Sequence, residues 1–199
     1  MARFGLSQTA LKRLKKEKEM LDDERQTETY FIAEPRDIDG NVNFKVWDVY
    51  FYLRDENSLY KDKVIMAEME FPEQYPLRPP KVVFLNKMFH PNVYHPTGKV
   101  CISILDEDTA GPLGCGAPED RWAPVQNIRT ILLSVVILLE NPNIESPANV
   151  DASKLLRDNL EEYKKIVVEL ANNENDKNMK NEKIKMIVEE LRRQKNINK

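Results

Sequence analysis

The spacing of apolar residues predicts a helix near the start of the chain. Ser7 is a favourable N-cap residue, and Leu11, Leu14 and Leu21 follow on one helical face with lysines around them. We expect this helix to run to about Glu24.

The pattern then changes to the two-residue alternation of β-strands. In residues 47–53, for example, apolar Trp47, Val49 and Phe51 alternate with the residues between them. Four segments have strand character: 29–34, 47–53, 62–71 and 81–85. Because their connectors are short, we expect an antiparallel meander.

Helical spacing returns after Pro124, where apolar side chains cover most of the circumference and predict a buried helix. Its apolar positions are Val125, Ile128, Ile131, Leu132, Val135, Val136 and Leu139. Residues 141–147 should end it. A further helical region should turn these side chains inward: Leu155, Leu156, Leu160, Tyr163, Ile166, Val167 and Leu170.

Residues 171–178 have the composition of a linker, and a last charged helix should follow. Its apolar stripe consists of Ile184, Ile187, Val188 and Leu191. The stripe could pack on the rest of the domain, bind a partner helix or associate with a second copy. The whole pattern predicts an α+β fold: an N-terminal helix, a four-stranded antiparallel meander, a loop-rich middle containing the candidate site, and C-terminal helices.

Composition narrows the class of protein. With 199 residues, we expect one domain with an appended element. A net charge of −3 argues against a nucleic-acid-binding protein, although basic residues cluster at positions 12–18. The longest apolar run, 131–139, is too short to span a bilayer, so no direct membrane anchor is expected. Two cysteines do not make a disulfide framework, which favours a reducing, intracellular setting.

The stretch FHPNVYHPTGKVCISIL at 89–105 contains both histidines of the chain and Cys101. A metal site is the least favoured interpretation, because the chain lacks the usual ligand spacings. A Cys–His nucleophile pair requires hydrogen-bond reach, and His90 and His95 both precede prolines in turns. A lone cysteine before a strand-like segment is most often a small buried hydrophobe. The residues alone leave these interpretations open.

Several motifs together resemble the ubiquitin-conjugating enzyme family. They are HPN at 90–92 followed by VCISIL, FPEQYPLRPP at 71–80, and RWAPVQNIRTILLSVVILLENPNIESPANVDAS at 121–153. The resemblance covers roughly residues 7–170 and implies the same α+β fold. A lengthened loop at 106–120 is similar to that of the acidic-loop subgroup, which is associated with degradative polyubiquitin chains and, in some members, with protein turnover at the endoplasmic reticulum.

The resemblance implies an acyl-transfer enzyme. Cys101 would accept ubiquitin as a thioester from the activating enzyme, which uses ATP, and pass it to a lysine of a protein substrate or of ubiquitin. Asn92 is the family's oxyanion or loop stabiliser, Ser146 stands at its gate position beside Glu145, and His90 would organise the HPN turn. Neither a metal nor a cofactor bound by this chain is implied.

The resemblance also implies partners. Contacts with the activating enzyme and a RING-type ligase are expected at Lys12, Arg13, Lys16, Leu77, Ala123 and Pro124. We hypothesise that an acidic group in the long loop steers the acceptor ubiquitin and gates Cys101: Asp106, Glu107, Asp108, Glu119 and Asp120. The expected domains are a catalytic core at 1–170 and a charged helical extension at 171–199.

One departure and two alternatives accompany this hypothesis. The turn before Cys101 is one residue longer than is usual in the family, with His95 as the extra residue, which puts the placement of Asn92 in question. The alternatives are conjugation of a ubiquitin-like modifier and a catalytically silent ubiquitin-binding scaffold. The resemblance implies a cytoplasmic protein, with the nucleus, or the endoplasmic reticulum surface through a partner, as further locations.

Overall fold

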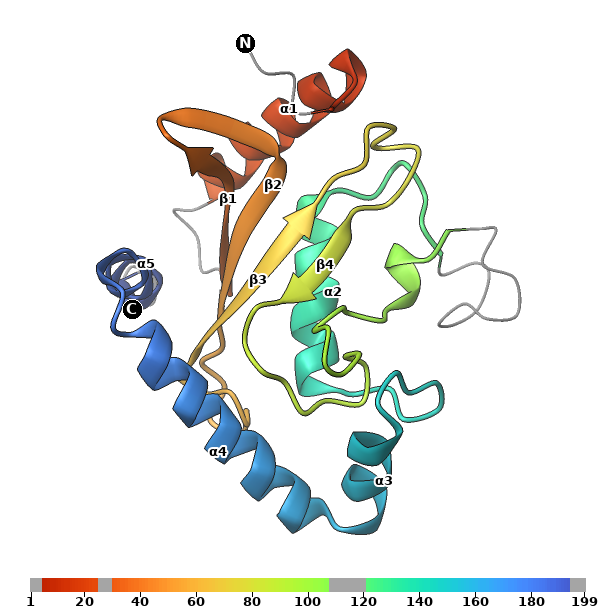
Figure 1. The fold of residues 1–199 in the computed structure, drawn as a ribbon, viewed down its shortest axis with the longest axis vertical. Helices are drawn as coiled ribbons and strands as arrows, with labels where there is room; N and C mark the ends of the chain where they lie inside the picture. The colour runs from red at the N-terminus through yellow and green to blue at the C-terminus, as the bar shows by residue number, and fades with distance from the viewer. Residues whose placement is uncertain (1–4, 25–29, 108–120, 194–199) are drawn as a thin grey trace.

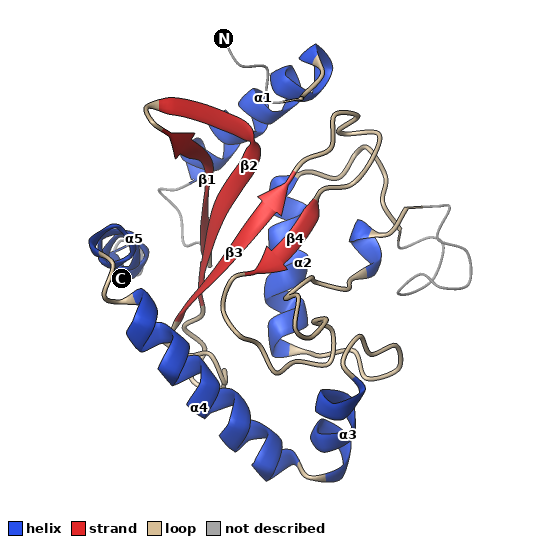
Figure 2. Ribbon diagram, viewed as in Figure 1, coloured by secondary structure: helices blue, strands red, loops and turns tan. Residues whose placement is uncertain are grey.

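The computed structural model describes residues 5–24, 30–107 and 121–193 of the chain (Figure 1). The elements follow the predicted order and confirm the α+β class (Figure 2). They are α1 (Gln8–Glu24), β1 (Phe31–Ile38), β2 (Asn41–Tyr52), β3 (Val64–Glu70), β4 (Lys81–Phe84), η1 (Ser103–Leu105), α2 (Ile128–Glu140), α3 (Val150–Asp158), α4 (Leu160–Asn178) and α5 (Glu182–Arg193).

The sheet is an antiparallel meander in the order β1-β2-β3-β4. Phe51 of β2 lies opposite Phe31 on one side and Ile65 on the other, which fixes the register of the apolar positions. β1 continues past its predicted end through Pro35, and the register shifts after that residue. The proline is tolerated because β1 is an edge strand, where a missing N–H need not break a ladder on both sides.

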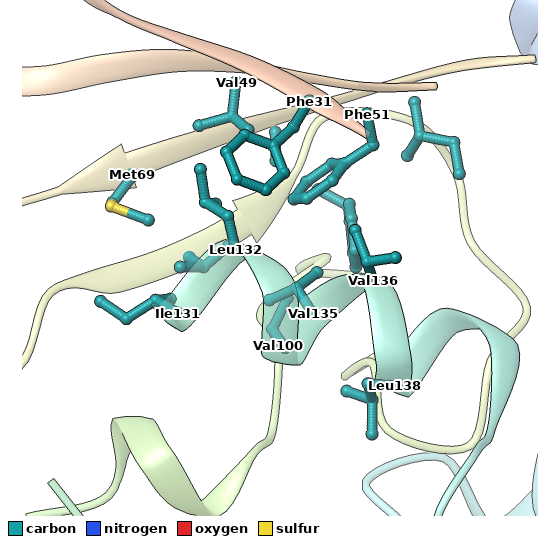
Figure 3. Close-up of a cluster of buried hydrophobic side chains, with 14 of the residues drawn as sticks. Phe31, Val49, Phe51, Met69, Val100, Ile131, Leu132, Val135, Val136 and Leu138 are labelled. Carbon is teal, nitrogen blue, oxygen red and sulfur yellow. The ribbon is translucent and has the colours of Figure 1, made fainter. Parts of the chain in front are cut away.

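The main core lies between one face of the sheet, here called the inner face, and α2 (Figure 3). Strand and helix side chains meet there, among them Phe31, Val49, Phe51, Met69, Val100, Ile131, Leu132, Val135, Val136 and Leu138. Burying each large apolar side chain of this kind stabilises the fold by about 1.5–3 kcal/mol. The inner face is therefore the main source of stability.

The opposite, outer face of the sheet is covered at one end by α5. Its apolar stripe packs against the strands in a second cluster: Ile32, Tyr50, Tyr52, Val64, Ile184, Ile187, Val188 and Leu191. Two arginines add polar contacts, because Arg192 Nε donates to the Tyr52 hydroxyl at 2.9 Å and Arg54 donates to the Leu191 carbonyl. Of the three alternatives for the stripe, the structure shows packing on the domain itself.

The predicted linker at 171–178 is wrong, because α4 continues through Asn178. Some polar side chains of this segment bind β3 and the loop after β4. Asn175 Oδ1 accepts from the Val64 N–H at 3.1 Å, and Glu174 accepts from the Lys87 N–H at 3.2 Å. These tertiary contacts override the weak helix propensity of asparagine. The expected boundary between core and extension at 170/171 thus falls inside one helix, and as a division into domains it stays a prediction.

Three apolar residues predicted to face inward lie at the surface. Val125 is 78% exposed and precedes α2, whose N-cap is Asn127. Leu160 and Ile166 of α4 are also exposed. The spacing of apolar residues therefore predicts more buried positions in α4 and before α2 than the structure has, since a helix buries only the stripe that another element covers. In the described part of the chain, no helix is both long and apolar enough to cross a membrane.

Candidate functional site

A short strand-like pairing places Cys101 beside Asn92. Val93 and Val100 form an antiparallel bridge, and the Cys101 N–H donates to the Asn92 carbonyl at 2.9 Å. The longer turn is absorbed beyond this pairing, where the Tyr94 N–H donates to the Lys99 carbonyl at 2.9 Å. The extra residue therefore does not separate Asn92 from Cys101.

The turn between the paired segments is fixed against β4. The Phe84 N–H donates to the Gly98 carbonyl at 2.9 Å. Gly98 has a φ of 74°, and a Cβ at this position would lie 2.3 Å from the Phe84 carbonyl oxygen. Only glycine meets both the left-handed backbone and the close approach. The turn that carries Tyr94 is thus fixed against β4.

His90 is buried at 1% exposure, and both its ring nitrogens are engaged. Nδ1 accepts from the Asn92 N–H at 3.0 Å, so Nε2 carries the hydrogen and donates to the Leu138 carbonyl of α2 at 3.1 Å. Burial lowers the pKa of His90 to about 4, against the opposing effect of the bond to Leu138. A neutral imidazole with two fixed partners suits a turn-organising residue better than a proton shuttle.

The Asn92 side chain joins the turn to the loop at 141–149. Its Nδ2 donates to the Asn143 carbonyl at 2.8 Å, and its Oδ1 accepts from the Asn143 N–H at 2.8 Å. A second bond between the same segments runs from the Asn149 N–H to the Pro91 carbonyl at 2.8 Å. An amide nitrogen carries two hydrogens, and the bond to Asn143 uses one. The geometry therefore accommodates both roles expected of Asn92.

Ser146 and Glu145 lie at the surface of this same loop. The Glu145 N–H donates to the Asn143 side chain at 2.9 Å, which holds the loop in shape on both sides of Asn143. The structure thus joins the loop of Ser146 to Asn92, and it leaves the Ser146 side chain exposed.

Cys101 lines a groove with a volume of about 780 Å³. Cys101 is 6% exposed, so a reactant reaches its sulfur mainly through this groove. The groove is also lined by Tyr94 and Lys99 of the turn and by Arg78 of the proline-rich loop. A groove with charged walls of this kind suits an extended peptide segment better than a compact apolar ligand.

The Cys101 sulfur takes part in a disulfide in this structure. This differs from the expectation of reduced cysteines, because a cysteine count does not show which sulfurs approach each other in space. The disulfide must be reduced before Cys101 can act as a nucleophile, since the thiolate is the reactive form.

Leu77 and Val125 are exposed apolar residues on two loops that are joined by a hydrogen bond. Leu77 is 74% exposed and Val125 78%. The Trp122 indole N–H donates to the Pro76 carbonyl at 2.9 Å, which joins the two loops directly. Of the other predicted contacts here, Ala123 is half-buried and Pro124 exposed.

A buried carboxylate, Glu17, connects α1 to the proline-rich loop and to the start of α2. It accepts from the Tyr75 hydroxyl at 2.7 Å and from the Ile128 N–H at 2.7 Å. It also pairs with Arg13 at 2.5 Å. Arg13, predicted as a partner contact, is therefore partly used within the fold, whereas Lys12 and Lys16 are exposed.

The predicted acidic group is only partly described. Glu107 pairs with Arg78 at 2.7 Å across the groove, and the Asp106 carbonyl accepts from the Trp122 N–H at 2.9 Å. Asp108, Glu119 and Asp120 lie outside the described residues. Within the described ranges, no cluster of three or more histidine, cysteine or acidic side chains could hold a metal ion.

Three residues of this region are not predicted from the sequence: Val125, Glu17 and Tyr94. The apolar spacing predicts Val125 in the core, and no sequence pattern distinguishes Glu17 from the other charged residues or Tyr94 from its neighbours. One signal was readable for Val125: Asn127 and Thr130 form a capping box, which marks the start of α2 after Val125. No sequence signal identified Glu17 or Tyr94.

Comparison with known proteins gives consistent results. The family model described as ubiquitin-conjugating enzyme matches residues 13–171. A probable ubiquitin-conjugating enzyme E2 of Encephalitozoon cuniculi is 53% identical over 148 residues, which is 74% of this chain and 68% of that protein. Human ubiquitin-conjugating enzyme E2 G2 is 43% identical over 162 residues, 81% of this chain and 94% of that protein. Ubiquitin-conjugating enzyme E2 15 of Schizosaccharomyces pombe is 46% identical over 121 residues, 61% of this chain and 71% of that protein.

Proposed function

The chain belongs to the ubiquitin-conjugating enzyme family, and we propose that it carries ubiquitin as a thioester on Cys101 and transfers it to lysine side chains. The observation that carries this proposal is the position of Cys101, which lines an open groove and is paired through its backbone with Asn92. An extended C-terminal peptide of ubiquitin would occupy such a groove with its last carbonyl at the sulfur.

Loading is a thioester exchange. The Cys101 thiolate attacks the thioester carbonyl of ubiquitin on the activating enzyme, and the thiolate of that enzyme leaves. Because the acyl group arrives activated, no strong base is required beside Cys101. His90 need not act as a base, which agrees with its neutral imidazole held by two hydrogen bonds.

Transfer to a lysine develops negative charge on the thioester oxygen. The Nδ2 hydrogen of Asn92 that is not bonded to Asn143 is the donor for this oxyanion, and one such donor is worth about 3–4 kcal/mol. The bonds to Asn143 hold the amide in place, so the stabilising and loop-holding roles act together. The exposed Ser146 on the joined loop orients the incoming lysine.

The exposed loop residues provide the ligase surface. Leu77 and Val125 would enter an apolar depression of a RING-type ligase, with Ala123 and Pro124 around them. The exposed Lys12 and Lys16 on α1 would meet the activating enzyme. The products are degradative polyubiquitin chains, a proposal that rests on the resemblance to the acidic-loop subgroup.

The test is incubation of the reduced protein with ATP, activating enzyme and ubiquitin, followed by reducing and non-reducing gels. We expect an adduct that reductant removes, absent in Cys101→Ser and retained in the matched variant Cys115→Ser. Loss in Cys115→Ser alone would contradict the assignment of the nucleophile. Adducts only with ubiquitin-like modifiers would favour that alternative, and no adduct at all would favour the silent scaffold.

A further inference from the structure

The side chain of Glu17 joins three segments of the chain at one buried point. It lies on α1 and is 4% exposed. Its Oε1 accepts from the Tyr75 hydroxyl of the proline-rich loop at 2.7 Å. Its Oε2 accepts from the N–H of Ile128, the first residue of α2, also at 2.7 Å. Both carboxylate oxygens therefore bind groups on other segments.

Arg13 adds a second connection between α1 and the segment before α2. Its Nε donates to Glu17 at 2.5 Å, and its Nη2 donates to the Gln126 carbonyl at 3.0 Å. The segment is thus held at both the Gln126 carbonyl and the Ile128 N–H. Because hydrogen bonds tolerate only a narrow range of distance and angle, these contacts fix where both loops lie relative to α1.

Each of the two loops carries a strongly exposed apolar residue close to its contact with Glu17. Leu77 is two residues from Tyr75 and 74% exposed, and Val125 is three residues from Ile128 and 78% exposed. Neither side chain gains much from burial within the fold. A partner that contacts both must meet them at one separation, because apolar side chains touch only when their heavy atoms approach within about 4–4.5 Å.

Stability alone accounts poorly for a charged group at this point. Replacing a buried ion pair by well-packed apolar side chains is often neutral or stabilising, so such a pair is a weak source of stability. The carboxylate also provides geometry, since one rigid group receives donors from two loops. This arrangement is what a surface needs when two loops must present a fixed spacing to a partner.

We propose that Glu17 is a positioning residue for ligase binding, which holds Leu77 and Val125 at the separation that a RING-type ligase requires. Glu17 does not line the Cys101 groove, so it acts through the two loops. The inference rests on the proposed function for the identity of the partner. The separation of the loops does not depend on that identity and can be measured without a ligase.

The first measurement therefore uses the protein alone. Spin labels are attached to Leu77→Cys and Val125→Cys in a chain whose two native cysteines are replaced by serine, and electron paramagnetic resonance gives the distribution of distances between the labels. Glu17→Gln keeps the shape of the side chain, but it loses the charge and one acceptor becomes a donor. Tyr75→Phe removes a single donor and keeps the ring. We expect a broader distribution in both variants, with the larger effect in Glu17→Gln.

The matched control is Glu174→Gln. Glu174 is also a buried carboxylate, 9% exposed, which accepts from the Lys87 N–H at 3.2 Å and pairs with Lys177 at 2.5 Å. It lies on α4, and these partners lie outside the two loops. We expect a loss of stability in urea denaturation similar to that of Glu17→Gln, with the distance distribution of the wild type.

The second measurement is the affinity for a RING domain, by isothermal titration calorimetry, with the tightest-binding domain of a purified panel as the probe. We expect Glu17→Gln to weaken binding about tenfold and Glu174→Gln to leave it unchanged. The effects of residues that act through one contact do not add. In a Leu77→Ala background, Glu17→Gln should therefore weaken binding less than about threefold.

An unchanged distance distribution in Glu17→Gln would overturn the proposal, as would equal broadening in Glu174→Gln. An unchanged affinity in Glu17→Gln, or a tenfold loss that persists in the Leu77→Ala background, would also overturn it. Broadening in Glu17→Gln without binding of any RING domain to the wild type would overturn the ligase surface of the proposed function, while the positioning of the loops by Glu17 would stand.

Discussion

The two faces of the sheet are covered in different ways. On the inner face, α2 packs over a continuous core that also supports the turn of Cys101, through the bond from His90 to Leu138. On the outer face, α5 covers one end of the strands through a smaller cluster that includes tyrosines and arginines. The difference indicates that the inner face determines whether the protein folds and holds its site, whereas the outer face holds an attachment that can open locally.

The largest effect should follow damage to the inner face. Ile131 of α2 is fully buried in the main cluster, so Ile131→Ala leaves a cavity there. We expect the free energy of unfolding to fall by about 3 kcal/mol, measured by urea denaturation. Ile137→Ala on the same helix, where the side chain is 62% exposed, should change it by less than about 0.5 kcal/mol. Equal losses in the two variants would contradict the importance of this face.

A second effect on the inner face depends on pH. The pKa of folded His90 is about 4, below its unfolded value of 6.5, so the unfolded state binds a proton first as pH falls. The neutral imidazole therefore stabilises the fold fully above pH 6.5, and the stability declines as pH falls toward 4. We expect a loss of about 2 kcal/mol between pH 7 and pH 5 from this group.

The measurement is urea denaturation at both pH values for the wild type and His90→Asn. The variant should be less stable at pH 7 and should lack this part of the pH dependence. The exposed His95 provides the control, His95→Gln, which should keep the wild-type pH dependence. A His90→Asn variant that loses as much stability on acidification as the wild type would contradict the role of the buried imidazole.

The smallest change in the free energy of global unfolding is expected for substitutions on the outer face. Leu191 of α5 is fully buried against the sheet, yet its replacement in Leu191→Ala cannot cost more than the free energy that docks this helix. We expect less than about 1 kcal/mol in global unfolding, but at least about tenfold faster hydrogen exchange in the amides of α5. Met186→Ala on the same helix, at 70% exposure, is the control. A global loss as large as that of Ile131→Ala would show that the two faces unfold as one unit.

Much of the fold was predictable because the apolar residues of the inner face recur at the regular spacings of strands and helices. Trp47, Val49 and Phe51 alternate as expected and are buried, and the helical spacing of α2 supplies the other half of the core. Each of these signals is local. The turn around Cys101 was predictable for a different reason, since its motif residues are adjacent in sequence.

The outer face was not predictable in the same way. The apolar stripe of α5 predicts a helix but not the surface that it packs against. Tyr52 and Leu191 are far apart in sequence, and no local pattern indicates that they meet. The same limit explains the missed helix at 171–178, where contacts with Val64 and Lys87 outweigh propensity. Tyr94 was missed because its contact with the sulfur depends on the path of a turn rather than on a pattern of residue types.

The late position of α5 in the chain has a consequence for synthesis on the ribosome. All four strands are complete at Phe84, and each pairs with its neighbour in sequence, so the sheet can form early. The outer face stays uncovered until α5 is synthesised, roughly a hundred residues later. At about 5–20 residues per second, this delay is on the order of 5–20 s. During that interval Ile32, Tyr50 and Val64 form an uncovered apolar surface on the nascent chain. This surface is where a chaperone would be needed during translation.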